Sequence, residues 1–466
     1  MRLTAGEILK VTGGTLLQGS ANALLERISI DSRVIGENCL FVPIIGENTD
    51  GHRYLSKAFE NGAKAALSMI VPADGSVPDN AALILVRDTV TALQAVGKEA
   101  RSRLSFPAVG VTGSVGKTTT REMVYRALSG GLRTFKTEKN YNNHLGVPLT
   151  LSEMNDSYEI AVLELGLNVP GELGTISALT NIDTAVITNI GVAHMEYYGN
   201  QEGIAREKFT VTQGFSSENP RPKRLFLNGD DPFLKEYRRF TEYPATLFGF
   251  GPENEYTAKN IRSENGNYVF DLVRQGELLI PVTLSALGQH NIGNALAALA
   301  VADYYGVSLE KAAASLSEFT GFKGRLEKKT FRNALMIDDT YNASPQSMIA
   351  GLQVLSEVSF GENGRRIAVL GDMLELGEEA GRFHYEVGKE LAKRPIDCVY
   401  LLGPNARLIG QAVKDCGGTM SVSCFDDSNA LLEALKQEIR PGDTAYFKAS
   451  RVTGLDKVTE GLLSNE

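Results

Sequence analysis

The sequence of 466 residues contains no tryptophan and only four cysteines. The cysteines are scattered and form no Cys-x-x-Cys pair, so neither a zinc knuckle nor a disulfide framework is indicated; they are Cys39, Cys398, Cys416 and Cys424. The sequence has no apolar run of about 18 residues, the length that a membrane-spanning helix needs. The segment from Met1 to Glu7 lacks the apolar core of a signal peptide. These absences favour the reducing cytoplasm.

The chain also lacks an excess of positive charge. Its formal net charge is −9, which argues against a broad nucleic-acid-binding surface. No internal repeat or low-complexity segment occurs. At roughly 100–200 residues per domain, the length suggests two to four domains.

A glycine- and hydroxyl-rich segment follows the apolar run from Phe106 to Val111 and precedes a helix-compatible run from Arg121 to Leu128. This order of strand, loop and helix is typical of a phosphate-binding loop, in which backbone N–H groups and the helix N-terminus bind phosphate oxygens. Lysine reaches the terminal phosphates and the next hydroxyl binds Mg²⁺. The expected nucleotide-binding residues are Thr112, Gly113, Ser114, Val115, Gly116, Lys117, Thr118 and Thr119.

One position departs from the strict GxxxxGK[ST] pattern, because Val111 stands where the first glycine is expected. The alternatives are therefore a glycine-rich turn of a dinucleotide fold or a chance match to the pattern.

Two further candidates follow apolar strands. Glu164 lies in the run from Tyr158 to Leu165, and His194 comes shortly after the run from Thr184 to Ile190. Ligands gather at the carboxyl ends of strands in α/β sheets. The alternatives are a solvated carboxylate for Glu164 and a structural histidine for His194. Lys208, in a predicted helix, reads by itself as a solvated surface lysine.

The pattern of strands and helices predicts an α/β fold with three domains. Residues 1 to 105 read as a small α/β domain, with a strand from Ile28 to Arg33 among its elements. Residues 106 to 325 read as a central nucleotide-binding α/β domain that includes an antiparallel ribbon over 252 to 286. Residues 326 to 466 read as a Rossmann-like, doubly wound domain. The segment Asp31-Ser32-Arg33 is either an ordinary turn or part of an anion pocket.

Several motifs in the same order resemble the Mur ligase family along the whole chain. Besides the phosphate loop, they are Asn140-Tyr-Asn-Asn143, Leu163-Glu-Leu-Gly166, Thr188-Asn-Ile-Gly-Val-Ala-His194, Gly288-Gln-His-Asn291 and Gly324-Arg325. Four stretches are similar to the branch that uses D-alanyl-D-alanine: Asp31-Ser-Arg33, Gly46 to His52, Asp338-Asp-Thr-Tyr-Asn342 and Leu370 to Gly377. The Asp-Asn-Pro-Arg motif of the branch that adds a diamino acid is absent.

The resemblance implies an ATP-dependent, peptide-bond-forming ligase of peptidoglycan precursor synthesis. ATP would phosphorylate the terminal carboxylate of a UDP-N-acetylmuramoyl tripeptide, and the amine of D-alanyl-D-alanine would attack the acyl phosphate. The partners would be these small molecules, with no nucleic acid and no membrane span, and the fold requires no partner chain. It also implies two Mg²⁺ sites.

The resemblance assigns roles residue by residue. Thr118 would bind one Mg²⁺, while Glu164 and His194 would bind a second, and Lys208 would be carbamylated. Asn291, Arg325 and Asp339, or less favourably Asp338, would bind the adenine, phosphates and ribose. Substrate contacts would come from Ser32, Arg33, Asp50, Gly51, His52, Asn140, Asn142, Asn143, Asn342 and Ser344.

This chain departs from the family at two positions. Ser344 replaces the second asparagine of Tyr-Asn-Ala-Asn-Pro, and Ala449 replaces the glycine of Lys-Gly-Ser-Arg. Two other functions stay open: a sister amide ligase with another acceptor, and a nucleotide-dependent switch that joins no substrates. The sequence leaves open whether the tripeptide carries lysine or diaminopimelate.

Overall fold

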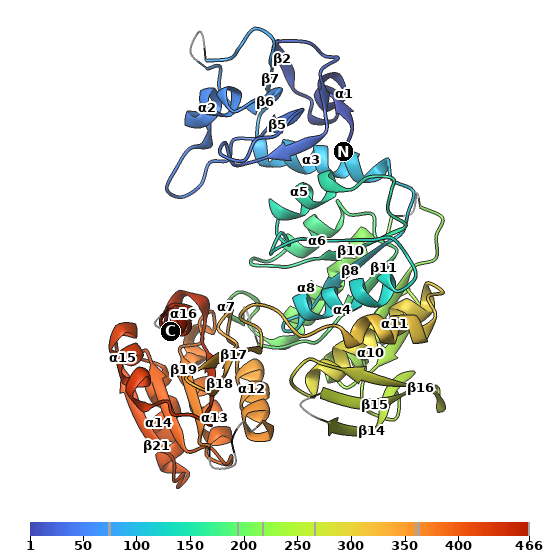
Figure 1. Cartoon of the computed structure of the whole chain (residues 1–466). Helices are drawn as coiled ribbons and strands as arrows, with labels where there is room; N and C mark the ends of the chain where they lie inside the picture. The colour runs from blue at the N-terminus through green and yellow to red at the C-terminus, as the bar shows by residue number, and fades with distance from the viewer. Residues whose placement is uncertain are drawn as a thin grey trace. The chain divides into compact units, whose positions relative to one another are not determined.

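The computed structural model describes residues 1–72, 76–192, 195–216, 219–264, 267–358, 361 and 364–464 (Figure 1). The chain falls into two compact units. The first comprises Met1–Thr112, Leu132–Val186 and Glu207–Leu225, and the second comprises Gly113–Gly131, Ile187–Arg206 and Phe226–Glu466. The predicted division into three domains at about residues 105 and 325 stays a prediction.

In the first unit, the residues shown in blue in Figure 1 form a five-stranded sheet of order β2-β7-β6-β5-β4 among the described residues. Only β2 runs antiparallel to its neighbour. The strands are β2 (Thr15–Gln18), β4 (Arg27–Ser29), β5 (Cys39–Phe41), β6 (Ala65–Ser68) and β7 (Ala82–Leu85), while β1 (Leu3–Thr4) pairs with β3 (Leu24–Leu25). The helices are α1 (Ala5–Thr12), η1 (Gly51–Tyr54), α2 (Leu55–Glu60) and α3 (Thr89–Ser102).

The strand predicted from Ile28 to Arg33 is shorter in the structure, because β4 ends at Ser29. The Ser29 hydroxyl accepts a hydrogen bond from the Asp31 N–H (3.1 Å) and donates one to the Asp31 carbonyl (2.9 Å). Such local side-chain bonds compete with strand pairing. The segment Asp31-Ser32-Arg33 is therefore a turn after the strand.

The largest sheet among the described residues has nine strands, in the order β16-β15-β14-β13-β12-β11-β8-β10-β9. The strands are β8 (Ala108–Thr112), β9 (Thr134–Lys136), β10 (Ile160–Glu164), β11 (Thr184–Ile187), β12 (Arg224–Asn228), β13 (Ala245–Phe248), β14 (Tyr256–Glu264), β15 (Asn267–Arg274) and β16 (Glu277–Leu284). In the first unit, β10 lies between β8 and β9 and is parallel to both. In the second unit, β14, β15 and β16 are antiparallel, which confirms the predicted ribbon.

The helices of this middle region are α4 (Lys117–Ser129), α5 (Gly146–Glu153), α6 (Glu172–Ser177), α7 (Met195–Tyr198), α8 (Gln201–Phe209), η2 (Thr210–Gly214), α9 (Pro232–Tyr237), η3 (Arg238–Phe240), α10 (His290–Tyr304) and α11 (Leu309–Ser317). Every residue of β8 and β10 is buried. Burial of both faces is typical of parallel strands, and it leaves their ends as the places where polar side chains meet solvent or ligands.

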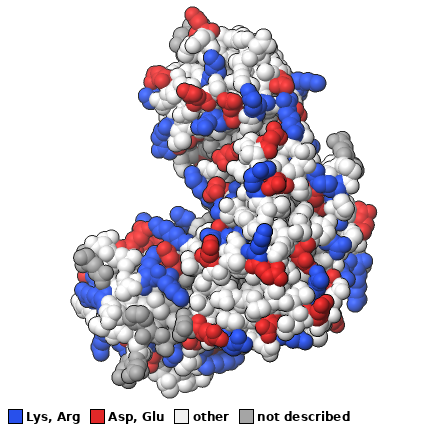
Figure 2. Space-filling view, turned by 45° about the vertical axis from the view of Figure 1, so that its right-hand side comes forward, with Lys and Arg blue, Asp and Glu red and all other residues white. Residues whose placement is uncertain are grey.

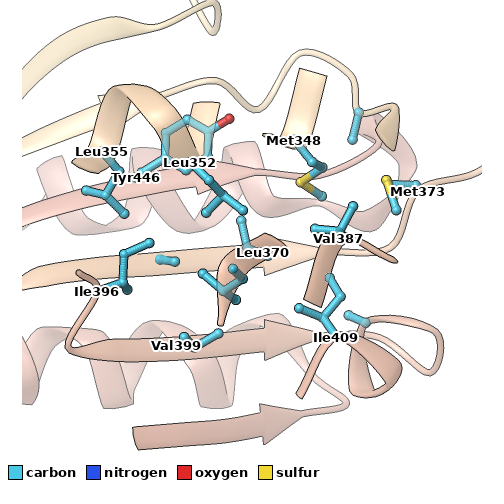
Figure 3. Close-up of a cluster of buried hydrophobic side chains, with 14 of the residues drawn as sticks. Met348, Leu352, Leu355, Leu370, Met373, Val387, Ile396, Val399, Ile409 and Tyr446 are labelled. Atoms are coloured by element: carbon cyan, nitrogen blue, oxygen red, sulfur yellow. The ribbon is translucent and has the colours of Figure 1, made fainter. Parts of the chain in front are cut away.

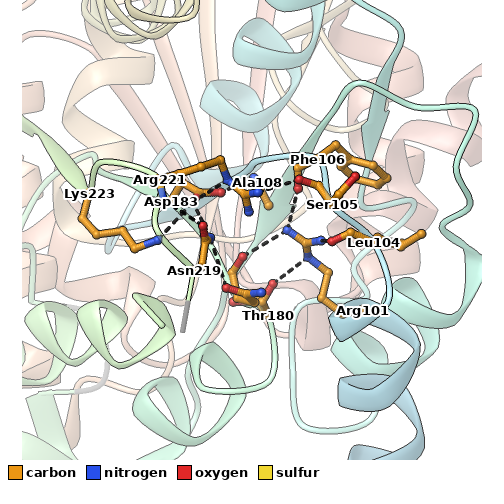
Figure 4. Close-up of polar contacts among 11 residues, drawn as sticks. Arg101, Leu104, Ser105, Phe106, Ala108, Thr180, Asp183, Asn219, Arg221 and Lys223 are labelled. Atoms are coloured by element: carbon orange, nitrogen blue, oxygen red, sulfur yellow. Dashed lines mark hydrogen bonds and ion pairs between the residues drawn. The ribbon is translucent and has the colours of Figure 1, made fainter. Parts of the chain in front are cut away.

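A buried polar cluster lies where β8 begins, and we call it the Arg101–Asp183 network (Figure 4). The Arg101 guanidinium is fully buried and donates to four carbonyls, those of Thr180 (2.9 Å), Leu104 (3.0 Å), Phe106 (2.9 Å) and Asn181 (3.0 Å). The Asp183 carboxylate accepts from Ala108 N–H (3.1 Å), Asn219 (2.6 Å), Arg221 (2.9 Å) and Lys223 (3.1 Å). Burial lowers the pKa of Arg101 to about 10. The network joins the end of α3 to the start of the middle sheet within the first unit.

The carboxyl-terminal part of the second unit has a six-stranded sheet among the described residues, in the order β17-β18-β22-β19-β20-β21. Only β17 is antiparallel to its neighbour. The strands are β17 (Glu327–Phe331), β18 (Ala334–Asp338), β19 (Arg366–Gly371), β20 (Cys398–Leu402), β21 (Ser421–Phe425) and β22 (Thr444–Lys448). The helices are α12 (Pro345–Glu357), η4 (Gly377–Glu379), α13 (Ala380–Leu391), α14 (Ala406–Asp415), α15 (Ser428–Glu438), η5 (Arg451–Thr453) and α16 (Leu455–Leu463).

Alternate residues of this sheet enter two separate cores. Ala368 and Leu370 of β19 pack with α12, α13 and α14 (Figure 3), whereas Ile367 and Val369 pack with α15 and α16. This alternation follows from the two-residue period of a strand. The sheet is therefore doubly wound, as predicted, and the α/β fold class is confirmed.

No helix among the described residues is long and apolar enough to cross a membrane. On the face shown in Figure 2, the described Lys and Arg side chains are interspersed with Asp and Glu.

Candidate active site

The phosphate loop connects β8, which ends at Thr112, to α4, which begins at Lys117. Gly113 and Gly116 have φ angles of 152° and 84°, which side chains disfavour. A Cβ at Gly113 would also lie 1.9 Å from Thr188 Oγ1. No side chain caps the N-terminus of α4, and buried Thr112 Oγ1 has no hydrogen-bond partner among the described residues. These features fit a loop that binds phosphate through its backbone.

The segment after β11 holds the phosphate loop in place. The Val115 carbonyl accepts hydrogen bonds from Thr188 Oγ1 (2.6 Å) and Asn189 Nδ2 (2.8 Å). Its N–H donates to Asn189 Oδ1 (3.0 Å), and the Gly191 N–H donates to Ser114 Oγ (2.8 Å). Ser114 and Val115 were predicted to bind nucleotide, whereas Thr188, Asn189 and Gly191 were predicted only as parts of a family motif. Polar residues directly after an apolar strand were the signal that could have identified them.

Lys117 lies at the first position of α4. Its Nζ donates to the Gly113 carbonyl at 2.8 Å and to the Ser114 carbonyl at 3.3 Å. Both acceptors belong to the phosphate loop itself. The ammonium is thus held at the place where the terminal phosphates of a nucleotide are expected.

A chain of amides connects α4 to α10. Thr120 Oγ1 donates to Asn294 Oδ1 (3.0 Å), Asn294 Nδ2 donates to Asn291 Oδ1 (2.9 Å), and Asn291 Nδ2 donates to the Leu287 carbonyl (2.6 Å). The structure therefore brings Asn291 close to the phosphate loop. Asn294, three residues further along the same helix, was missed, although its helical spacing from Asn291 was visible in the sequence.

Asp338 and Asp339 differ in how their carboxylates are partnered. Asp338 is bound by Lys329 Nζ (2.5 Å) on one oxygen and by Thr340 Oγ1 (2.7 Å) on the other. Asp339 Oδ2 accepts from Lys448 Nζ (2.6 Å) and Tyr446 OH (2.9 Å), while none of the described residues donates a hydrogen bond to Oδ1. Burial, and next the Asp339 charge, raise the pKa of Tyr446 well above its usual value. Of the two carboxylates, Asp339 is therefore the one with an oxygen open to a further donor, and its predicted role at the ribose stays a prediction.

Glu164 closes β10 and is only 2% exposed, so it is not a solvated carboxylate. Its Oε1 accepts from Asn142 Nδ2 at 2.8 Å. Neighbouring amides shape the same loop: the Asn140 carbonyl accepts from Asn142 N–H (2.8 Å), and Asn143 Oδ1 accepts from Gly146 N–H (2.8 Å) at the start of α5. His194, its predicted companion at a metal, lies outside the described residues.

Lys208 lies in α8 and is 2% exposed. The expectation of a solvated surface lysine, drawn from residue type alone, is therefore wrong. The apolar residues Ile204 and Ala205 of the same helix are buried as well. The carboxylate of Glu207 accepts from Gly171 N–H (3.0 Å) at the start of α6, so this face of α8 is packed rather than exposed.

The predicted substrate residues of the first sheet form two compact loops. Arg33 donates to both oxygens of Asp31 (2.9 and 2.8 Å), which lowers the pKa of Asp31 to about 2. Ser32 is buried, and its carbonyl accepts from Asn61 Nδ2 (2.7 Å). The Arg33 side chain is 85% exposed.

In the second loop, Asp50 accepts from the N–H (2.9 Å) and from Nδ1 (2.7 Å) of His52. The backbone bond, and then the ring, lower the pKa of Asp50. His52 Nε2 accepts from the Met69 N–H (3.0 Å), so both ring nitrogens are used within the first unit. A Cβ at Gly51 would lie 2.6 Å from the Ile44 nitrogen.

Asn342 and Ser344 shape the start of α12. Asn342 Oδ1 accepts from the Ala343 N–H (2.9 Å), and Ser344 caps the helix in a reciprocal box with Ser347. Serine therefore serves at this position as an N-cap. Ala449, the other departure from the family, is fully buried against Gly371, where an added Cβ would lie 2.7 Å from the Ala449 Cβ.

The fold and the phosphate loop define an α/β nucleotide-binding protein. The family profile of the Mur ligase middle domain matches residues 111–302, and that of the Mur ligase glutamate ligase domain matches residues 324–451. The UDP-N-acetylmuramoyl-tripeptide–D-alanyl-D-alanine ligase of Bacillus subtilis is 37% identical over 470 residues, covering 100% of this chain and 99% of the relative. The chain belongs to the Mur ligase family.

Solved structures of the same family are similar to this chain over nearly its whole length. A crystal structure of MurF from Acinetobacter baumannii superposes with a TM-score of 0.88 at 31% identity, covering 100% of this chain and 99% of the other. MurF from Thermotoga maritima in complex with ADP has a TM-score of 0.80 at 29% identity, covering 95% and 99%.

Proposed function

We propose that this chain is the ligase that joins D-alanyl-D-alanine to UDP-N-acetylmuramoyl tripeptide, with hydrolysis of ATP to ADP and phosphate. The observation that carries the proposal is the 37% identity to the Bacillus subtilis ligase of that name over the whole of this chain. The tripeptide would carry either lysine or diaminopimelate.

The chemistry requires activation of a carboxylate. A carboxylate is a poor electrophile, so its terminal oxygen first attacks the γ-phosphorus of ATP and ADP leaves. The dipeptide amine then attacks the acyl carbon, and phosphate leaves from the tetrahedral intermediate. Phosphoryl transfer depends on positioning and charge neutralisation. Lys117 and the N–H groups of the phosphate loop would neutralise the phosphates, while Asn291, Arg325 and Asp339 would hold the nucleotide.

Oxygen ligands fit the Mg²⁺ ions that such a reaction uses. Thr118 would hold one, and Glu164 with His194 the other. The burial of Glu164 supports this assignment, since a buried carboxylate charge needs a compensating cation. Mg²⁺ would supply charge neutralisation on the phosphates and on the acceptor carboxylate.

Lys208 would carry a carbamate. Carbamylation needs the neutral amine, and burial disfavours the charged form of a lysine. The 2% exposure of Lys208 therefore supports the modification. The resulting anion would help to place a metal ion.

The first sheet would bind the UDP end of the substrate through Ser32, Arg33 and the loop from Asp50 to His52. We further propose three domains with boundaries near residues 105 and 325, a monomer, and activity in the cytoplasm. Because the substrates would bind to separate domains, we expect these domains to close when the substrates bind.

The test is ADP release with ATP, Mg²⁺ and UDP-muramoyl tripeptide, with and without D-alanyl-D-alanine, and mass spectrometry of the product. Dipeptide-dependent ADP release with formation of the pentapeptide supports the proposal. Activity with a free diamino acid but not with the dipeptide would indicate a sister ligase. A rate of ATP hydrolysis that does not change with any amine acceptor would indicate a nucleotide-dependent switch.

A further inference from the structure

A buried carboxylate joins two loops beside the end of β10 in the first unit. Glu172, at the start of α6, is 8% exposed. Its Oε1 lies 2.9 Å from Nδ1 of His144 and accepts from the N–H of that residue (3.3 Å), while its Oε2 accepts from the Asn168 N–H (2.7 Å). The Gly166 N–H donates to the Asn142 carbonyl at 2.7 Å. The two joined segments, which we call the Glu172 rim, are residues 142–144 and 166–172.

The carboxylate of Glu172 is used within the rim itself. Burial raises the pKa of this group, but hydrogen bonds from His144 and Asn168 outweigh burial, and the pKa lies below its usual value. Glu172 is therefore ionised at neutral pH. Because a carboxylate only accepts, Nδ1 of His144 carries the hydrogen between the two groups. Glu172 thus fixes the orientation of the His144 ring and leaves Nε2 as the ring nitrogen that a ligand can contact.

The rim exposes polar side chains that have no partner among the residues the structure describes. The side chain of His144 is 47% exposed, and only its Nδ1 takes part in a hydrogen bond. Asn168 is exposed, and its bond to Glu172 comes from the backbone, so its side-chain amide is also open to a ligand. Val169 follows and is 51% exposed. The rim therefore offers an imidazole, an amide and a small apolar surface, and Glu172 can balance the charge of an imidazolium.

The rim connects the two ends of the proposed donor site, all within the first unit. On one side, α5 begins two residues after His144, and Leu145 and Leu149 pack in the core of the first sheet. On the other side, Asn142 Nδ2 donates to Glu164 at 2.8 Å. A donor that extends from the loops of the first sheet to Glu164 would therefore pass this segment.

The lengths of the donor and of the rim agree. In the proposed reaction, the carboxylate that becomes phosphorylated lies at Glu164. Diaminopimelate has a second carboxylate, five carbon atoms away, which is an extended span of about 7 Å. Asn142, which contacts Glu164, and His144 are two residues apart, and two residues also span at most about 7 Å. The end of the third side chain can therefore reach His144, with a carboxylate in diaminopimelate or an ammonium in lysine.

We propose that His144, oriented by Glu172, donates from Nε2 to the side-chain carboxylate of the third residue of the tripeptide, so that the donor carries diaminopimelate and not lysine. The amide of Asn168 supplies a second polar contact to the same end. This proposal rests on the proposed function and names the substrate class within it. A lysine ammonium would instead meet the imidazolium, while the carboxylate of the rim, Glu172, is buried.

The test compares steady-state ADP release by the full chain with two donors, UDP-muramoyl tripeptides that end in diaminopimelate or in lysine. The wild type should have a KM for the diaminopimelate donor roughly 10- to 100-fold below that for the lysine donor, because only the first makes the charge-assisted hydrogen bond. His144→Gln keeps a polar side chain without the charge, so its two KM values should nearly converge. The KM values for ATP and D-alanyl-D-alanine should not change.

Asn168→Asp is the second variant, and it leaves the rim intact because the backbone of residue 168 makes the bond to Glu172. The added negative charge should repel the diaminopimelate carboxylate and attract the lysine ammonium, so the preference should fall about 10-fold or invert. Asn155→Asp is the matched control. It makes the same change at an exposed residue before β10, at the opposite end of that strand, and should keep the wild-type preference.

A tripeptide whose side-chain carboxylate is amidated supplies a further readout. The wild type should use this donor about as poorly as His144→Gln uses the acid. Equal KM values of the wild type for the two donors, or a preference for lysine, would overturn the proposal. A preference for diaminopimelate that both His144→Gln and Asn168→Asp leave unchanged would also overturn it. If neither donor gives dipeptide-dependent ADP release by the wild type, it is the proposed function that fails.

Discussion

The Arg101–Asp183 network and the phosphate loop both concentrate polar groups, yet they partner them differently. Arg101 donates to carbonyls of the segment after α3 and of the segment before β11 (Figure 4). Lys117 donates to carbonyls of its own loop. The hydrogen bonds of Arg101 join segments that are far apart in the sequence. The hydrogen bonds of Lys117 stay within one loop, so rotation of this long side chain can replace the carbonyls with the phosphate oxygens of a ligand.

This difference in hydrogen-bond partners distinguishes charged groups that stabilise the fold from charged groups that are placed to bind a ligand. The partners of Arg101 and Asp183 are backbone groups and side chains that a ligand has no reason to displace. The phosphate loop instead keeps a helix N-terminus without a side-chain cap and a buried Thr112 hydroxyl without a partner among the described residues. Variants in the two regions should therefore separate activity from stability.

The largest effect is expected for Lys117→Ala. The phosphate charge loses its compensating cation, so ADP release should fall about 1000-fold or more. The thermal unfolding midpoint should change little, because the hydrogen bonds from Lys117 to the Gly113 and Ser114 carbonyls stay within the phosphate loop. Coupled ADP release and a thermal scan on the same preparation check both parts. Near-full turnover would show that the loop is not catalytic.

Lys208→Ala should come next, with ADP release lowered roughly 10- to 100-fold. If Lys208 acts as a carbamate, added formate or acetate should restore part of the activity by supplying an anion. Lys117→Ala in the same carboxylate buffers is the control, since an added anion cannot replace its cation. Full activity of Lys208→Ala without any added carboxylate would refute the carbamate role.

The sequence predicted the features that contiguous residues form, but it did not predict the contacts between residues that are far apart in the sequence. The phosphate loop could be recognised because its glycines, lysine and hydroxyls are contiguous, and Glu164 because it ends an apolar strand. The burial of Lys208 could not, since it depends on how α8 packs. Asn189 supports the phosphate loop through hydrogen bonds to Val115, from which it is far apart in the sequence. The end of β4 was misplaced because the Ser29–Asp31 turn competes with pairing.

Arg101→Met tests the structural side of the comparison. Removing the guanidinium leaves buried carbonyls without donors, which should lower the free energy of unfolding by about 3 kcal/mol. The folded fraction should keep its activity per molecule. Urea denaturation followed by fluorescence or circular dichroism measures the change. Arg103→Met is the matched control, because Arg103 forms exposed ion pairs with Glu7 and Glu99 and should change stability by under about 1 kcal/mol. A loss of activity with an unchanged free energy of unfolding would show that Arg101 serves activity and not stability.

The smallest effect is expected for His384, a buried titratable group that stabilises the fold and binds no ligand in the proposed mechanism. His384 is fully buried, its Nε2 accepts from the Met373 N–H (2.9 Å), and its Nδ1 contacts the Ala380 carbonyl (2.6 Å). Burial lowers the pKa of this histidine from its usual value of about 6.5. Folding therefore favours the neutral ring, so its contribution to stability is complete above pH 6.5 and is lost as the pH falls from there through the lowered pKa. Thermal midpoints between pH 8 and pH 5 should fall more steeply for the wild type than for His384→Gln, whose amide keeps an acceptor but has no proton to gain. Parallel curves for the two proteins would show that His384 does not contribute to the acid sensitivity of the fold.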